Sequence, residues 1–450
     1  MAKPQELLYK IHKVNARAAT DNLHNVVRLW STSEVQEIVK KINEAYLPWD
    51  EFRKKSWSTE RREIIWYILS ATRLFSQKRT TIKDKDGQHY KFDPHRHTEF
   101  LHEIDLEFGG NLLGIPDFSD GDRRQVIRRN LIEESIASSK LEGANTSRET
   151  ARRMLSEGRK AQTKSEQMIT NNHAAMTQIE EIAKQQTMSR EMLLALHREV
   201  TKGTLTDARH EGSLRETLNA NGKRLVIKPW NDETIAYVTP DRKFVEEQLP
   251  HFIAFANDAD GSEFIHPLFK AIMLHFWIGL LHPFEDGNGR VARIVFYWYM
   301  LRKGYWAFAY LSLSEHIQKS PSQYAMAYVN TEQDSYDLNY FIQYNVEKLK
   351  LARRHLQAFA KSKIAENRQR VMVARRDTKL NTRQILLLQY LANDELRQIN
   401  VDVYQGNNNI GYITAVTDLK KLVEQGFLTK KKSGRNVDYL PTQKIQMLFK

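Results

Sequence analysis

Apolar residues recur at spacings of three and four along most of the chain, and this period predicts a mainly α-helical fold. Near the N-terminus the spacing predicts helices over 34–42 and 60–74. Between 80 and 92 the helical period is lost and β-forming residues flank Asp86-Gly87, a pair that favours a tight hairpin turn. Residues 1–122 are therefore expected to form a helical region with a short hairpin.

The helical period returns at about Arg123 and continues to Gln186. Within it, Thr146 begins the sequence Thr-x-x-Glu149, a capping box whose two side chains can each bind a backbone N–H at the start of a helix. We expect one helix to end near Gly143 and the next to begin at Thr146, with one or two amphipathic helices up to Gln186.

A second interruption of the helical period lies between 211 and 240. There, β-branched residues gather on both sides of Asn221-Gly222, the strongest short-range hairpin signal in the chain. We expect a β-hairpin at this place. Beyond it, 266–281 and 291–301 are apolar on nearly every face, which predicts two buried helices.

The C-terminal part of the chain is basic. A charged helix over 351–376 is expected to connect to a module at 377–450, whose pattern of three helices and two strands resembles a winged helix-turn-helix with 412–421 as its recognition helix. From 361 to 450 there are 17 Lys or Arg against 8 Asp or Glu, so most of the net charge of +13 lies there. This favours DNA as a partner, while protein binding or a merely solvated basic surface stays open.

Length and composition restrict the class of protein. At 450 residues, 41% hydrophobic and 27% charged, the chain suits about three folded domains and is not intrinsically disordered. The sequence has no cysteine, which excludes disulfides, thiolate nucleophiles and Cys-ligated metal sites. Because no apolar run is long enough to span a bilayer and the first residues do not form a signal peptide, we expect a cytoplasmic protein without membrane segments.

The residues with the clearest chemistry lie between the two predicted buried helices, in the polar loop 282–290. Pro283 disfavours the helical conformation at His282 and so ends the incoming helix there. Gly287 and Gly289 let successive N–H groups turn inward, and the following helix adds its positive N-terminal end. The loop is therefore predicted to bind phosphate.

Charged residues around this loop extend the prediction. Arg290 and Arg293 are three residues apart, hence on one helical face, where both guanidinium groups can hold the outer phosphates of a nucleotide. Asp286 offers a hard oxygen ligand for Mg²⁺. His282 has a ring suited to accept a proton from an attacking hydroxyl at neutral pH.

The run from His282 to Arg293 resembles the signature of the Fic (filamentation induced by cAMP) family, His-Pro-Phe-x-Asp/Asn-Gly-Asn-Gly-Arg-x-x-Arg, and matches it at every defined position. The resemblance extends over the helix at 266–275, the region 212–240 and the helices up to about Leu349. It implies a helical domain at 123–350 with one β-hairpin flap. The implied activity is transfer of AMP from ATP to a Ser, Thr or Tyr hydroxyl of a protein.

The resemblance also implies roles for single residues. His282 is then the base, Asp286 the metal ligand, and Asn288 the centre of the cradle for the α- and β-phosphates. The other implied nucleotide-binding residues are Gly287, Gly289, Arg290, Arg293 and Tyr324. A packing role for Tyr324 is equally open. Gly289 favours AMP transfer, because a family member that phosphorylates instead carries Lys there.

A segment upstream of the loop resembles the family's inhibitory helix, Ser/Thr-x-x-x-Glu-Gly/Asn, with Ser138, Glu142 and Gly143 at the defined positions of a helix expected over 131–143. A carboxylate at Glu142 can pair with Arg293 and occupy the guanidinium that the γ-phosphate needs. The alternative is an ordinary surface helix. Some family members use this glutamate to remove AMP, so the reverse reaction also stays open.

The sequence thus predicts a protein adenylyltransferase that is autoinhibited by Glu142, uses ATP with Mg²⁺, and modifies a protein hydroxyl. The alternative is a DNA-binding transcriptional regulator that senses nucleotide through its Fic domain. Gly212 and Arg215 match the Gly-x-x-Arg that often precedes the family's flap, and 219–226 is a candidate edge for pairing with a target strand. The target, self-modification and homodimerisation stay open.

Overall fold

The computed structural model describes residues 23–109, 120–185, 187–218, 226–227, 237–378, 380–392, 398–408, 410–433 and 436–448. The chain forms two compact units. The first comprises 1–113 with 129–353, and the second comprises 114–128 with 354–450. Most of the expected N-terminal region (1–113) and most of the expected Fic region (129–350) lie in the first unit, whereas 114–128 belong to the second unit together with 377–450.

The first unit begins with a helical layer and a hairpin. Its elements are α2 (Leu23–Trp30), α3 (Ser33–Ala45), α4 (Trp49–Phe52), α5 (Thr59–Ser76), β1 (Lys78–Lys83), β2 (His89–Phe92), α6 (Thr98–Ile104) and the π-helical turn η1 (Asp105–Gly109). The predicted helices at 34–42 and 60–74 are confirmed as α3 and α5, and the Asp86-Gly87 turn joins the antiparallel strands β1 and β2.

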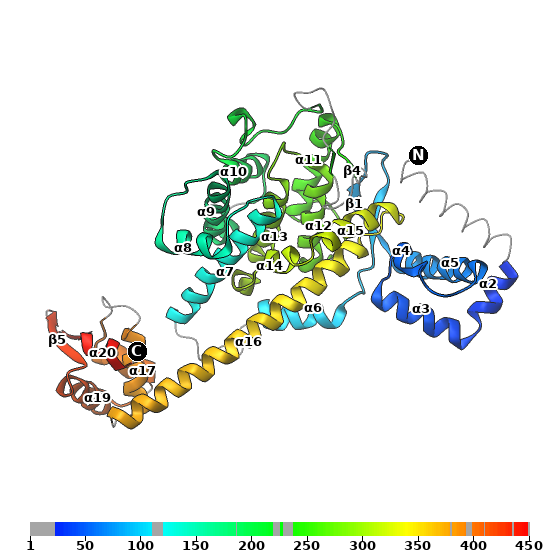
Figure 1. Cartoon of the computed structure of the whole chain (residues 1–450). Coiled ribbons are helices and arrows are strands. Elements are labelled where there is room, and N and C mark those ends of the chain that lie inside the picture. The colour runs from blue at the N-terminus through cyan, green and yellow to red at the C-terminus, as the bar shows by residue number, and fades with distance from the viewer. Residues whose placement is uncertain are drawn as a thin grey trace. The chain divides into compact units, whose positions relative to one another are not determined.

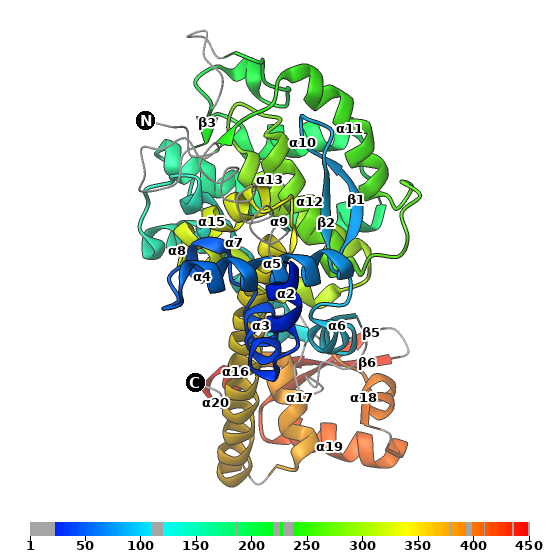
Figure 2. The ribbon, with the colours of Figure 1, turned by 90° about the vertical axis from the view of Figure 1, so that its right-hand side faces the viewer.

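The helices α7 to α16 follow, and α9, α10 and α11 pack against a buried pair, α12 and α13 (Figures 1 and 2). Helices α7 and α16 each cross from one unit to the other. Their bounds are α7 (Asp120–Leu141), α8 (Arg148–Glu157), α9 (Lys164–Gln185), α10 (Arg190–Thr201), η2 (Ala208–His210), β3 (Val226–Ile227), β4 (Tyr237–Val238), α11 (Arg242–Ala256), α12 (Pro267–Leu281), α13 (Asn288–Arg302), η3 (Trp306–Tyr310), α14 (Leu313–Gln318), α15 (Pro321–Gln333) and α16 (Asn339–Thr378). The two predicted core helices are confirmed, since nearly all residues of α12 and α13 are buried.

One sequence prediction in this region is wrong in detail. The N-cap of α8 is Ser147, whose hydroxyl accepts from the Thr150 N–H, so the helix begins one residue later than the capping box at Thr146 predicts. Either hydroxyl residue can cap, and the fold selects the second. Within 211–240 the described residues include one antiparallel strand pair, β3 and β4, with Val226 opposite Val238. The turn expected at Asn221-Gly222 lies in 219–225, outside the described residues.

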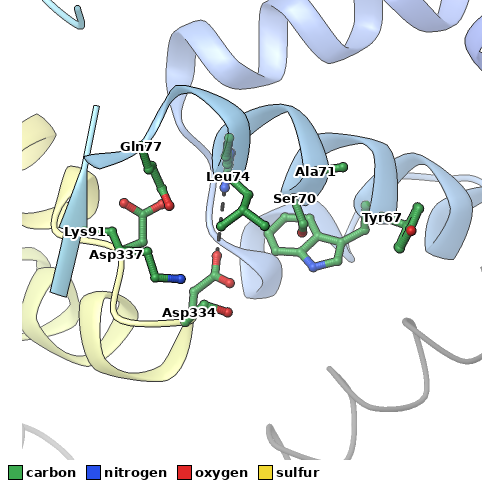
Figure 3. Close-up of a pocket in the computed structure, with 11 residues that line it drawn as sticks. Tyr67, Ser70, Ala71, Leu74, Gln77, Lys91, Asp334 and Asp337 are labelled. Atoms are coloured by element: carbon green, nitrogen blue, oxygen red, sulfur yellow. Dashed lines mark ion pairs between the residues drawn. The ribbon is translucent and has the colours of Figure 1, made fainter. Parts of the chain in front are cut away.

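A buried polar network joins the N-terminal helices to the turn between α15 and α16. The Arg73 guanidinium donates to the Tyr340 hydroxyl at 2.7 Å, to the Leu47 carbonyl and to Asn43, and stacks 4.1 Å over the Tyr46 ring. Burial raises the pKa of Asp337, which accepts from the Tyr46 hydroxyl, to about 6. Figure 3 shows a cavity of about 300 Å³ beside this network.

Within the described residues, the second unit continues with three helices, a hairpin and a short final helix. Its elements are α17 (Thr382–Ala392), α18 (Val401–Asn408), α19 (Tyr412–Glu424), β5 (Leu428–Ser433), β6 (Asn436–Pro441) and α20 (Gln443–Leu448). Asp418 of α19 is buried and accepts from Asn381 at 2.7 Å, from Arg383 at 3.0 Å and from the Tyr404 hydroxyl at 3.2 Å. One carboxylate thereby ties α19 to α18 and to the start of α17.

Within the described ranges, no helix combines the length and the apolar character that crossing a membrane requires.

We predict that Arg73→Met lowers the free energy of unfolding by about 3 kcal/mol, because it leaves Asp334 and Asp337 without the buried cation that faces them. The matched control is Arg53→Met, which breaks an exposed ion pair with Asp50 and costs less than about 1 kcal/mol. Urea denaturation of the full chain measures both. Equal losses in the two variants would contradict the stabilising role of the Arg73 network.

Candidate active site

The loop between α12 and α13 is held in shape by its own side chains. His282 ends α12 in the left-handed conformation, with φ of 46°, and Gly287 begins α13 with φ of 86°. The Asn288 side chain accepts from the Phe284 N–H at 3.0 Å and donates to the Phe284 carbonyl at 2.8 Å. Asn288 thus uses its side chain to close the loop.

The start of α13 has the properties of an anion site. The first N–H groups of a helix have no carbonyl partner within it and carry the positive end of the helix dipole. Nε and Nη2 of Arg290 and Nη1 of Arg293 are buried and have no hydrogen-bond partner among the described residues. Buried donors left unpaired are costly, so this cluster is suited to oxygen-rich anions.

The two arginines point to different neighbours. Arg290 is fully buried and donates from Nη1 to the Val200 carbonyl of α10 at 2.7 Å, whereas Arg293 reaches towards α7. The prediction that both arginines lie on α13 within one turn is correct. Arg290 is expected to bind phosphate through its guanidinium, but one of the guanidinium nitrogens, Nη1, is bonded to α10.

His282 lies at the mouth of the loop, and its backbone is fixed by Arg215. The Arg215 guanidinium donates to the carbonyls of His282 at 2.6 Å and of Pro240 at 2.8 Å, and its N–H donates to the Pro283 carbonyl at 2.9 Å. Burial, helped by the Arg215 charge, lowers the pKa of His282 to about 4. The ring is therefore neutral at pH 7 and able to accept a proton.

Asp286 is a suitable ligand for a magnesium ion. Its side chain is 42% exposed, its Oδ1 accepts from the Gly287 N–H at 2.5 Å, and Arg290 Nη2 lies 3.4 Å away. Among the described residues no cluster of three or more acidic or histidine side chains could hold a metal alone. A single exposed carboxylate fits Mg²⁺, which is commonly held by one or two carboxylates together with substrate phosphates.

The predicted inhibitory segment lies in α7 and contacts Arg293 directly. Arg293 donates from Nε to the Ser138 hydroxyl at 2.8 Å, and from Nη2 to the Ser138 carbonyl and to Glu142 Oε1, both at 2.9 Å. Arg293 is 1% exposed and Glu142 22% exposed, so the ion pair is largely shielded from water. Gly143, with φ of 92°, ends the segment after α7.

Three residues spaced four apart, in α7 and directly after it, bond to side chains of α13. Glu134 is buried and accepts from the Tyr297 hydroxyl at 3.0 Å, while Ser138 and Glu142 meet Arg293. The Glu134 carboxylate also accepts from the Ser314 N–H and from the hydroxyls of Ser312 and Ser314. This anchor fixes α7 two turns away from Glu142, and the sequence analysis missed it.

Tyr324 is half-buried beside the same arginine. Its hydroxyl lies 2.7 Å from His275 Nε2 and 3.4 Å from the Tyr328 hydroxyl. Burial, together with the Arg293 charge, lowers the pKa of His275 to about 3, so this histidine is neutral. The hydrogen bonds of Tyr324 support a packing role beside the site.

The structure thus shows a helical domain in which buried arginine side chains gather at the N-terminus of α13. In a comparison with known protein families, residues 187–300 match the model of the Fic/DOC family.

The chain is similar to the protein adenylyltransferase fic-1 of Caenorhabditis elegans, with 38% identity over 68 residues, 15% of this chain and 13% of that protein. It is similar to the protein adenylyltransferase Fic of Nematostella vectensis, with 33% identity over 69 residues, 15% of this chain and 16% of that protein. A Fic family protein from Desulfovibrio desulfuricans G20 has a TM-score of 0.46 at 17% identity, covering 76% of this chain and 94% of that one. The chain thus spans only a small part of the curated relatives.

We predict that the effect of Gly289→Ala on the free energy of unfolding depends on whether Glu142 is present. A Cβ at Gly289 would overlap the Glu142 carboxylate, 2.8 Å from its Cδ and 3.0 Å from Arg293 Nη1, so the substitution should cost about 1–3 kcal/mol in the native chain. In a Glu142→Gly background the overlap with the carboxylate is gone and only the 3.0 Å contact with Arg293 Nη1 remains, so the cost of alanine should fall below about 1 kcal/mol. Urea denaturation of the four variants measures this, and a destabilisation of the same size in both backgrounds would refute the contact.

Proposed function

We propose that the protein is an adenylyltransferase that transfers AMP from ATP to a hydroxyl group of a protein. The observation that carries the proposal is the convergence, at one helix N-terminus, of unpaired N–H groups, buried guanidinium donors and a neutral histidine at the loop mouth. The family of residues 187–300 and the named activity of the similar proteins support it.

In the proposed reaction, His282 accepts the proton of the target hydroxyl. The freed oxygen attacks the α-phosphorus of ATP, the bond to the β-phosphate oxygen breaks, and pyrophosphate leaves. The N–H groups of Asn288, Gly289 and Arg290 offer donors to the charge that builds on the phosphate oxygens. Asp286 would hold Mg²⁺, which neutralises phosphate charge when bound.

We further propose that Glu142 restrains the reaction. A carboxylate 2.9 Å from Arg293 Nη2 takes the guanidinium edge that the γ-phosphate would need, and the pair is shielded enough to persist. Because Glu142 also lies against Gly289, it occupies space at the N-terminus of α13 in addition to pairing with the charge of Arg293. Removal of AMP by the same glutamate is compatible with this position and is the alternative use of the site.

The acceptor is proposed to be a protein that reaches the site under the flap, with the chain itself as one candidate. The flap base is rigid, because Arg215 binds both the loop and Pro240, where the flap ends. A target strand could then be held at a fixed distance from His282.

The first test is incorporation of label from α-labelled ATP, by the chain alone and with a cell lysate. We expect little label with the native protein and at least about tenfold more with Glu142→Gly, because release of one charged contact of about 1.4 kcal/mol changes occupancy tenfold. The double variant Glu142→Gly/His282→Ala is the matched control and should incorporate none.

Equal labelling by the native chain and Glu142→Gly would contradict the restraint. Label that persists without His282 would contradict its role as base. If no variant is labelled although ATP binds, AMP transfer itself is wrong, and a nucleotide-sensing regulator becomes the better description.

A second candidate function rests on the second unit, and we propose that residues 377–450 bind DNA. The helices α17 to α19 and the hairpin β5–β6 have the order of a winged helix, and α19 exposes Tyr412, Thr414 and Thr417. Lys430, Lys431 and Lys432 are all exposed along β5, which suits phosphate contacts. This activity is compatible with AMP transfer in the same chain.

We predict that replacing Lys430, Lys431 and Lys432 by Ala weakens binding to duplex DNA and lowers the slope of log affinity against log salt by about 2–3. Fluorescence anisotropy over a range of salt concentrations measures it. The control replaces three exposed lysines of the first unit, Lys40, Lys55 and Lys85, which removes the same charge. An equal change in both variants would mean that only net charge, and not the hairpin, matters.

A further inference from the structure

His197 is a buried histidine for which the proposed reaction has no use. It lies in the last two turns of α10 and is 0% exposed. Its ring stacks on Phe284 of the catalytic loop, with ring centroids 3.8 Å apart and planes 3° from parallel. The histidine is therefore packed directly beneath the loop that binds phosphate in the proposed function.

Both ring nitrogens of His197 have a partner, and the two partners belong to different segments. Nε2 lies 2.9 Å from the carbonyl oxygen of Asp286, and Nδ1 lies 3.0 Å from the N–H of Gly212. A carbonyl can only accept and an N–H can only donate, so Nε2 must carry the proton and Nδ1 must be the acceptor. The tautomer is fixed by these two contacts.

The contact with Asp286 fixes the orientation of the peptide between Asp286 and Gly287, whose N–H donates to Asp286 Oδ1. The Asp286 carbonyl and the Gly287 N–H belong to one planar trans peptide, in which the C=O and N–H point in opposite directions. Holding the oxygen on His197 thus turns the Gly287 N–H away from α10. Two further residues of α10 lie against this region. The Val200 carbonyl accepts from Arg290, and a Cβ at Gly287 would lie 2.8 Å from Thr201 Cγ2.

The contact with Gly212 fixes the other side of the site. Gly212 has φ of 72°, and a Cβ there would lie 2.9 Å from Arg198 Nε, so only glycine fits. Three residues later, Arg215 binds the carbonyls of His282 and Pro240. His197 is thus a bridge between the middle of the catalytic loop and the segment that leads into the flap.

We infer that His197 is a positioning residue that couples the phosphate-binding loop to the base of the flap, and so sets the distance between bound nucleotide and target hydroxyl. The inference rests on the proposed function for its catalytic consequence. The bridge itself is a property of the fold and can be tested without any transfer of AMP.

The two halves of the bridge can be separated by substitution. In Gln, the amide nitrogen stands as many bonds from Cβ as Nε2 does in His, so His197→Gln keeps a donor for Asp286 and loses the acceptor for Gly212. In Asn, the amide oxygen stands where Nδ1 does, so His197→Asn keeps the acceptor and loses the donor. His197→Phe keeps a ring that stacks on Phe284 and loses both bonds.

The experiment measures two quantities on the full chain. Hydrogen exchange by mass spectrometry follows the peptide that contains Gly212, and calorimetry gives the affinity for ATP with MgCl₂ in a Glu142→Gly/His282→Ala background, which prevents turnover. We expect His197→Gln to speed exchange at Gly212 by about five- to tenfold and to change ATP affinity by less than about twofold, because one hydrogen bond is worth roughly 1 kcal/mol. His197→Asn should leave exchange at Gly212 nearly unchanged and weaken ATP binding by about five- to tenfold. His197→Phe should both speed exchange at Gly212 and weaken ATP binding.

This crossed pattern distinguishes positioning from mere packing. If all three variants change exchange and affinity together, His197 only supports the fold and the inference is overturned. Absence of label in Glu142→Gly would refute AMP transfer but leave the crossed pattern as a valid test. If Glu142→Gly is strongly labelled but His197→Asn leaves the affinity for ATP unchanged, the proposed function is sustained and the bridge is refuted.

Discussion

The site depends on one buried guanidinium. Arg293 is enclosed by α12, α13 and α7, and a cation in that position is stable only where acceptors surround it. Helix α7 supplies these acceptors through the Ser138 hydroxyl, the Ser138 carbonyl and Glu142. The position of α7 is thus linked to the charge of Arg293. A ligand that supplies other oxygen atoms to Arg293 could replace the Glu142 side chain, but not the backbone carbonyl of Ser138.

The remainder of the site is organised by bonds to backbone carbonyls. Arg215 holds the carbonyls of His282 and Pro240, Arg290 holds that of Val200, and His197 holds that of Asp286. Each of these donors is buried, and each binds a segment distant in sequence. A loop with two glycines would otherwise have many conformations, so these bonds supply the rigidity that its own sequence lacks.

The local geometry of the loop could be predicted from sequence because it depends on residues within one short run. His282, Asp286, Gly289 and Arg293 lie where local rules put them, around the end of one helix and the start of the next. The partners across the fold could not be predicted. That Arg290 would bind α10, or that Glu134 would anchor α7 on α14, depends on how helices far apart in sequence pack. The capping error at Thr146 has a local cause, since two adjacent residues can both cap and only the packing of α8 selects Ser147.

Ser138 of α7 and Glu142, which directly follows the last residue of α7, are one turn apart and bind the same arginine, yet their consequences for the proposed reaction are opposite. Ser138 binds Nε, the edge that points back to α7, and so holds the guanidinium in place. Glu142 binds Nη2 and covers Gly289, whereas Nη1, which has no partner among the described residues, lies near Gly289 as well. Departure of the Glu142 side chain alone would therefore expose an arginine that Ser138 still positions. The proposed restraint would need only a side-chain movement, because Glu134 keeps α7 itself in register, and the site would then already be organised for the proposed ligand.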